Sequence, residues 1–539
     1  MKIKNIITGI SLSAAALTGC QKGDLTSNPN VGSSASATLL LNAISVRLAG
    51  GGGSIISGNS VLSTESGNVP ETLTGGIYKY DQYILSNYSY YQGTNTYNWS
   101  YTATQYDMLK YVVLLEKQAA VQYPSAPNAN IYAALAKFYR AYAYIWFTQR
   151  VGDIPASEAG DISTPQPKYD TQKDVYKESL NLLDTANTII GALISGGSIS
   201  GSSVVDASGD IFGLTYLQWQ KIINAYKIRT LISLSKRAID NSDLQIQAQF
   251  AAIVGNPTKY PLPTSNSDNL VFKYNSANAY PLYANAYNVY LNISKTYLDL
   301  ITANKDPRTF AVATPAPAQI TAGKTVSDFS AYVGADPNVG IGSLSTNSGN
   351  GLYSFLNYNR YYTSLTGANA EPYILVGYPE LCFNIAEGIN RGWASGDAGS
   401  WYNNGIDASL TLYGLSNGKQ LTVADRSGAT IGTVTVDVTT FKNNVAYQGG
   451  SAGLTQILQQ KYIALFLNSN WEAFYNWRRT GIPAFSQGGD GIGTDGNKIP
   501  RRWQYPSSEQ TENAIKYNAS LQSQFGGKDD LTQDTWLTK

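Results

Sequence analysis

Amphipathic helical periodicity runs through most of the chain and limits the folds that it can adopt. In residues 130–150, apolar side chains recur every three or four positions, which places them on one face of a helix. Thr171-Gln172-Lys173-Asp174 matches a capping box, a pattern that starts helices. Further helical runs are 106–121, 215–240, 286–303, 373–391, 454–476 and 508–523. Helices in consecutive pairs predict a mainly α fold, a superhelix of tetratricopeptide-like hairpins with long loops.

One segment breaks this helical pattern. Residues 421–423 and 431–436 alternate around Ser427-Gly428, which predicts a small β-hairpin. Residues 20–60 are rich in Ser, Gly and Asn, and we interpret them as a flexible tether. No later stretch has the composition of a linker, so residues 61–539 are predicted to form a single domain.

The first 19 residues have the features of an export signal. Two lysines precede an apolar stretch that is too short to span a bilayer, and small residues follow. Leu17-Thr18-Gly19-Cys20 resembles a bacterial lipobox, whose cysteine is acylated and becomes the first residue of the mature chain. The sequence therefore predicts a signal peptide over 1–19 and a lipid anchor on Cys20. Gln21-Lys22-Gly23-Asp24 is similar to a Bacteroidetes surface-export signal, which favours an outer-membrane location facing the exterior.

The chain contains no histidine, and this excludes several kinds of catalytic site. Ser-His-Asp and Cys-His nucleophiles cannot form, and zinc would lack its usual imidazole ligands. Ser451 lies in a G-x-S-x-G sequence, but without a histidine base we interpret 449–453 as a glycine-rich loop before a helix. The absence of histidine does not exclude glycoside hydrolysis by a pair of carboxylates, because such a site needs only two acids. We expect no catalytic residues, no metal and no cofactor.

The charge balance argues against nucleic acid as a partner. The chain has 38 Lys+Arg and 37 Asp+Glu residues, and charged residues make up only 14% of it. Binding to nucleic acid needs a basic surface that displaces counterions. Tyrosine is abundant instead, with 40 residues. This composition favours a neutral ligand.

Aromatic residues gather in three segments, 77–101, 272–290 and 353–362, and each segment also contains asparagines. Sugars present apolar C–H faces and hydroxyl groups, so their binding needs flat aromatic surfaces with polar neighbours. For any single tyrosine, packing in the core is nevertheless the commoner role. The residues that we predict to contact ligand are Tyr90, Tyr91, Asn98, Trp99, Tyr280, Tyr283, Tyr358, Arg360 and Tyr361.

Short motifs follow one another from about residue 100 to the C-terminus. They occupy residues 152–155, 305–308, 380–388, 391–393, 460–466, 477–483 and 499–502. Together with the lipobox, this ordered set resembles the SusD/RagB family of Bacteroidetes nutrient-uptake lipoproteins, particularly its SusD-like second subgroup. Asn384 and the hairpin at 421–436 depart from the family's pattern, and we interpret the hairpin as an insertion.

The resemblance implies a non-enzymatic binding protein on the outer membrane, with helical hairpins that support a ligand surface. It further implies that the protein holds an oligosaccharide, or in some relatives a peptide, over a TonB-dependent transporter of the SusC type. Arg478 and Arg479 are interpreted as structural groups that cap helices and pair with carboxylates. Glycan capture is the leading hypothesis because the charge is low. Peptide capture and a surface adhesin or scaffold are the alternatives.

Overall fold

The computed structural model describes residues 35–49, 77–97, 106–160, 163–197, 199–274, 280, 282, 288–363, 372–469, 471–487 and 499–539. The longer helices are α2 (Ala37–Ala49), α5 (Tyr106–Gln122), α6 (Ile131–Val151), α7 (Gln172–Ser195), α8 (Tyr216–Ser233), α9 (Ile246–Gly255), α10 (Lys295–Ala303), α13 (Ile341–Gly349), α15 (Tyr378–Asn390), α16 (Ala398–Leu412), α18 (Gly450–Ala464), α19 (Glu472–Thr480) and α21 (Ala514–Phe525).

The shorter elements lie between these helices. The short α-helices are α3 (Ile77–Tyr80), α4 (Ser89–Gln92), α11 (Arg308–Val312), α12 (Pro317–Thr321), α14 (Tyr358–Tyr361), α17 (Val438–Asn444) and α20 (Glu509–Glu512). The 3-10 turns are η2 (Ser235–Arg237), η3 (Ser242–Leu244), η4 (Asn266–Asp268), η5 (Asn288–Tyr290) and η6 (Phe329–Ala331). The strands are β1 (Ile84–Ser86), β2 (Leu270–Phe272), β3 (Leu291–Ile293), β4 (Tyr373–Val376), β5 (Gln420–Ala424) and β6 (Thr430–Thr435).

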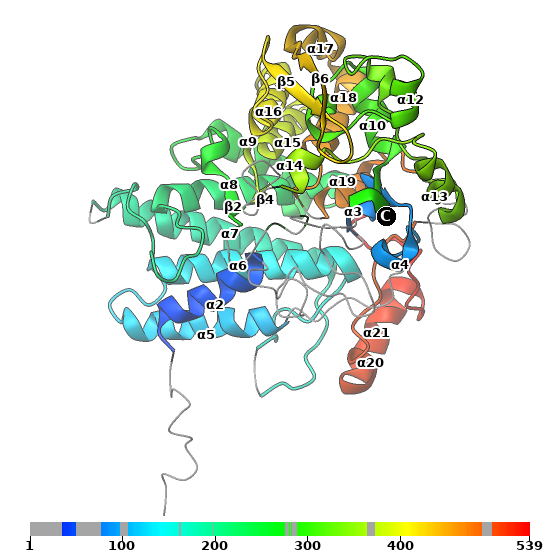
Figure 1. Ribbon diagram of the computed structural model, residues 1–539. Coiled ribbons are helices and arrows are strands. Elements are labelled where there is room, and N and C mark those ends of the chain that lie inside the picture. The colour runs from blue at the N-terminus through cyan, green and yellow to red at the C-terminus, as the bar shows by residue number, and fades with distance from the viewer. Residues whose placement is uncertain are drawn as a thin grey trace, which may run out of the picture.

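Helices α5 to α8 lie side by side in the left half of Figure 1, and each packs against the next along the chain. Side-chain caps explain where two of them begin. The Asn130 side chain accepts a hydrogen bond from the Ala133 amide before α6, at 3.0 Å, and Thr171 accepts one from the Asp174 amide before α7, at 3.1 Å. Such caps satisfy amides that have no partner inside the helix. The predicted starts of both helices are confirmed.

The helical stack continues from α8 into α15, which packs against α16 and α18. Two glycines allow α15 to approach α16 and the Phe250 side chain of α9 closely. A β-carbon on Gly405 would lie 2.7 Å from Cζ of Phe383, and one on Gly388 would lie 2.1 Å from Cζ of Phe250. The mainly helical fold that the periodicity predicts is confirmed. Among the helices that the structure describes, none has both the length and the apolar character that crossing a membrane requires.

Three antiparallel strand pairs complete the described fold. β1 pairs with β3, β2 with β4, and β5 with β6. The β5–β6 pair is the hairpin that the sequence predicts, and that prediction is confirmed. The other two pairs join segments far apart in the sequence, and β1–β3 brings Ser86 opposite Leu291.

The predicted tether over 20–60 is wrong for residues 37–49, which form α2. Leu40, Leu41 and Ile44 are buried, and α2 packs against α5. The apolar run within ATLLLNAISVRLA gives this helix a face to bury, and burial outweighs the Ser- and Gly-rich composition around it. Residues 1–34, with Cys20, and residues 50–60 lie outside the described part of the chain.

Five predicted helical runs are not continuous helices. The run 508–523 divides into α20 and α21 at Asn513, and in 215–240 α8 ends at Ser233. The other three contain a strand or a break between two helices. In 286–303 the residues Leu291–Ile293 form β3, 373–391 begins with β4, and 454–476 divides into α18 and α19. Two of the breaks are strands that pair with distant partners, which local periodicity does not show. At the third break Leu467 has a φ of 56°, which an α-helix does not accommodate. The glycine-rich loop predicted over 449–453 is wrong for residues 450–453, which form the first turn of α18.

Candidate functional site

Four tyrosines from two distant segments form an exposed aromatic surface, which we call the tyrosine platform. Tyr88 precedes α4, Tyr90 and Tyr91 lie in it, and Tyr290 ends η5. The ring of Tyr290 stacks against Tyr88 and Tyr91, with centroids 4.9 and 5.4 Å apart. Tyr90 meets Tyr91 edge-on at 4.8 Å. Tyr90 is 80% exposed, and Tyr88 and Tyr91 are 42% and 43% exposed.

Backbone pairing brings the two segments of the tyrosine platform together. β1 ends just before Asn87 and Tyr88, and β3 starts directly after Tyr290. The Asn87 amide donates to the Tyr290 carbonyl at 3.0 Å, which extends the β1–β3 pairing to the platform. Figure 1 shows α4 on the opposite side of the molecule from the left-hand ends of α5 to α8.

The buried side chain of Asn87 fixes the base of the platform. Its Nδ2 lies 3.1 Å from the Val289 carbonyl, 2.7 Å from Oδ1 of Asn292 and 2.8 Å from Oγ of Ser348. A buried amide that loses its partners costs free energy, so these contacts favour one position for the loop. Asn87 thereby connects the platform to β3 and α13.

A second buried asparagine closes the loop behind α4. Oδ1 of Asn95 accepts from the Ser86 amide at 2.7 Å, and Nδ2 of Asn95 donates to the Ser86 carbonyl at 2.8 Å. The Asn95 side chain thus forms with Ser86 the same two hydrogen bonds that a neighbouring strand would form with its backbone. Nearby, Nζ of Lys79 donates to the Thr94 carbonyl at 2.9 Å, and burial lowers the pKa of Lys79 to about 8. The exposed rings therefore rest on a buried polar support.

The structure divides the aromatic segment 77–101 into a core group and a surface group. The core group is Tyr78, Tyr80, Tyr83 and Tyr97, all of which are buried. Tyr83, for example, donates its hydroxyl to the Tyr462 carbonyl at 2.6 Å and stacks on the Tyr462 ring. Of the predicted ligand residues in this segment, Tyr90 and Tyr91 lie in the tyrosine platform. Asn98 and Trp99 lie outside the described residues.

The other predicted ligand residues lie elsewhere. Tyr280 is 2% exposed and Tyr361 is fully buried, so neither ring reaches the surface. Arg360 lies over the Tyr413 ring at 4.5 Å, and Tyr358 stacks on Tyr362. Tyr358 and Arg360 belong to α14, which Figure 1 shows at a distance from α4. Tyr283 lies outside the described residues.

Sequence reasoning missed Tyr88 and Tyr290 as platform residues. Both lie in aromatic segments, but only the β1–β3 pairing shows that their rings meet. The one local signal is their position, because each adjoins a short apolar run that forms a strand.

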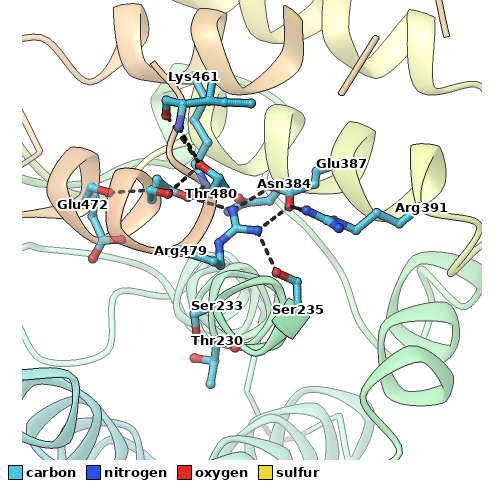
Figure 2. A network of polar contacts seen from close by, with 12 residues as sticks. Thr230, Ser233, Ser235, Asn384, Glu387, Arg391, Lys461, Glu472, Arg479 and Thr480 are labelled. Atoms are coloured by element: carbon cyan, nitrogen blue, oxygen red, sulfur yellow. Dashed lines mark hydrogen bonds and ion pairs between the residues drawn. The ribbon is translucent and has the colours of Figure 1, made fainter. Parts of the chain in front are cut away.

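A buried polar network connects α15, α18 and α19, as Figure 2 shows. Arg479 donates to the two carboxylate oxygens of Glu387 at 2.5 and 2.9 Å, and Arg391 donates to the same carboxylate at 2.9 Å. Arg479 also donates to Oγ of Ser235 at 2.8 Å. Arg478 donates to the carbonyl of Gln149 at 2.7 Å. The structural role predicted for the two arginines is confirmed.

Charge pairing sets the protonation of this network. Burial alone would raise the pKa of Glu387, but Arg479 and Arg391 outweigh it and lower the pKa to about 2. Nζ of Lys461 donates to Oδ1 of Asn384 at 2.6 Å, and burial lowers the pKa of Lys461 to about 8. Asn384 also donates to Oε1 of Glu380 at 3.3 Å, so it links a base to an acid. These groups bind one another and hold the helices together.

Comparisons with known proteins agree with this architecture. A family model of SusD-like proteins, described as starch-binding and associating with the outer membrane, matches residues 54–506. A SusD homolog from Bacteroides fragilis is 25% identical, with a TM-score of 0.75 over 94% of this chain and 100% of that chain. A second SusD homolog from the same species is 26% identical, with a TM-score of 0.71 and the same coverage. No curated protein matches the sequence at a significant level.

Proposed function

Because the chain belongs to the SusD-like family of starch-binding proteins that associate with the outer membrane, we propose that it captures oligosaccharides at the cell surface. The observation that carries this proposal is the tyrosine platform. Its rings reach solvent but also contact one another, because Tyr290 stacks against both Tyr88 and Tyr91 above a buried polar support. A surface arranged before the ligand arrives loses little entropy on binding.

The chemistry of the platform suits a neutral sugar. Tyrosine rings offer flat apolar area to the C–H faces of a pyranose, and their hydroxyl groups can exchange hydrogen bonds with the sugar. Two rotatable bonds per side chain leave little rotamer entropy to lose. Asn98 and Trp99 follow shortly after Tyr97, and we include them in the proposed ligand surface.

In this proposal the protein passes the oligosaccharide to a TonB-dependent transporter of the SusC type and is held to the outer membrane by acyl groups on Cys20. The family description supports the membrane association, and the lipobox-like Leu17-Thr18-Gly19-Cys20 supports the anchor. The bound sugar is released unchanged. The chain has no histidine, and SusD-like proteins bind rather than hydrolyse their ligands.

The test is binding of purified protein to maltoheptaose and to oligosaccharides of other linkages, by calorimetry. Removal of an aromatic anchor costs about 2 kcal/mol, which is roughly a thirtyfold loss of affinity. We expect Tyr90→Ala and Tyr91→Ala each to approach this loss with little change in melting temperature, because the two side chains are 80% and 43% exposed and lie outside the hydrophobic core. Wild-type protein incubated with the bound oligosaccharide should release no reducing ends.

Tyr123→Ala is the matched control. Tyr123 is 41% exposed, close to the 43% of Tyr91, and it lies just after α5 in another part of the fold. The control variant should bind like wild type. Equal affinities of all three variants for every sugar that wild type binds would show that the platform is not the ligand surface. Saturable binding of peptides alone, abolished by Tyr90→Ala, would replace the glycan with a peptide.

A further inference from the structure

A groove of about 370 Å³ lies beside the β5–β6 hairpin, at the top of Figure 1. Its floor contains Pro307 and Phe310, and Phe329 and the strand residues 433–435 form its sides. Side chains of consecutive strand residues point to opposite faces. Three consecutive residues of β6 therefore border the groove with the edge of the strand, and we call this cavity the β6 groove.

The backbone amides of Thr433 and Thr435 lie on the edge of β6 that faces away from β5, and no described residue accepts a hydrogen bond from them. In an antiparallel pair, alternate residues direct their N–H and C=O groups toward the neighbouring strand. The Val436 amide donates to the Lys419 carbonyl at 2.8 Å, so Val434 also points toward β5, and Thr433 and Thr435 point away from it. Within the described part of the chain, the amides of Thr433 and Thr435 donate to no other group.

The floor of the groove is apolar and aromatic. Phe310 is 3% exposed, and its ring contacts the half-buried Phe329 ring, with centroids 4.8 Å apart. Pro307 lies beside them and is buried. An apolar side chain placed over these groups would leave water and gain contacts.

Two opposite charges border the same groove. Lys305 is exposed, and its charge, after the hydrogen bonds from Thr440, helps to lower the pKa of Asp437. Asp437 accepts from the amide and the hydroxyl of Thr440 at 2.8 and 2.6 Å, which leaves carboxylate lone pairs unused. A short peptide carries the complementary charges, a terminal carboxylate for Lys305 and a terminal ammonium group for Asp437.

We propose that the β6 groove binds a free peptide of about three residues, which adds to β6 as a further strand along Thr433 to Thr435. Unpaired strand edges accept extended peptides through backbone hydrogen bonds, and a pocket beside the edge selects the side chain. A sugar could use the threonine hydroxyls, but it offers no donors and acceptors at the spacing of a strand. The site is independent of the glycan surface proposed above.

The probe is the tripeptide Ala-Phe-Ala, titrated against the full-length chain by ligand-observed NMR. Thr433→Pro and Thr435→Pro each remove one outward amide, and proline is tolerated on an edge when its nitrogen faces away from the partner strand. Loss of one such bond should weaken binding about tenfold. Thr422→Pro is the matched control, because Thr422 lies opposite Thr433 and its outward amide is on the β5 edge.

A second arm changes the peptide instead of the protein. An analogue with methyl groups on both peptide nitrogens cannot donate to β6, and it should bind at least tenfold more weakly to wild type. Tyr90→Ala should bind the tripeptide normally, which separates this site from the glycan surface. No saturable binding of Ala-Phe-Ala, equal binding of the methylated analogue, or displacement of the peptide by maltoheptaose would overturn the proposal.

Discussion

Glu387 is a fully buried carboxylate whose partners are two arginines, so replacing it should lower the free energy of unfolding. The change Glu387→Gln leaves Arg479 buried without its counter-charge. Breaking a buried pair in this way costs about 3 kcal/mol or more of unfolding free energy. Urea denaturation at pH 7 measures the loss. The control is Glu512→Gln, an exposed glutamate at the end of α20, which should unfold like wild type.

The same residue gives the protein a pH-dependent stability. The pKa of Glu387 falls from 4.5 to about 2 on folding. A lowered folded-state pKa adds stability above the unfolded value, and that stability is lost as the pH falls from about 4.5 through about 2. At about 1.4 kcal/mol for each pKa unit, the contribution is about 3 kcal/mol. The difference between wild type and Glu387→Gln should therefore shrink across this window, and a constant difference would contradict the ion-pair account.

At the scale of elements, the contact of α15 with its neighbours depends on two glycines. A β-carbon on Gly405 or Gly388 would overlap a phenylalanine ring, at 2.7 or 2.1 Å. Gly405→Ala and Gly388→Ala should each lower the unfolding free energy by about 1–3 kcal/mol, although alanine is the better helix former. Thermal unfolding measures the effect.

Gly342 in α13 is the matched helical glycine, because a β-carbon there would meet nothing within 4 Å. Gly342→Ala should raise the unfolding free energy by about 0.5–1 kcal/mol. If Gly405→Ala were stabilising as well, helix propensity and not close packing would decide the outcome at α15.

Elements also show what the sequence could predict and what it could not. Caps and periodicity predict α6 and α7 closely, because both signals are local. β3 and β4 lie inside predicted helices, because their strand conformation comes from partners that local sequence does not reveal. The candidate site is likewise predictable only where the signal is local. Tyr90 and Tyr91 stand out by composition, but the burial of Tyr280 and Tyr361 and the contribution of Tyr290 depend on tertiary contacts.

At the scale of the whole molecule, the proposed anchor can be tested apart from the ligand surface. Cys20 precedes α2, the first described helix, which begins at Ala37, so the proposed acylation site lies outside the described fold. Cys20→Ala should therefore move the protein from the membrane fraction to the soluble fraction, while its melting temperature and its affinity for maltoheptaose stay unchanged. The measurement is fractionation of cells followed by immunoblotting. A Cys20→Ala protein that stays with the membrane would contradict anchoring by acylation.

The contacts of Asn87 set the order in which the molecule can become active. Its side chain binds partners that are 202, 205 and 261 residues further along the chain. Contacts of such long sequence separation form late, since closing a long loop costs entropy before any bond repays it. A chain folded only as far as α8 cannot assemble the platform, because Tyr290 and the partners of Asn87 follow α8 in the sequence. Under the proposed function, ligand binding is therefore coupled to completed folding, and an incompletely folded copy should not bind sugar.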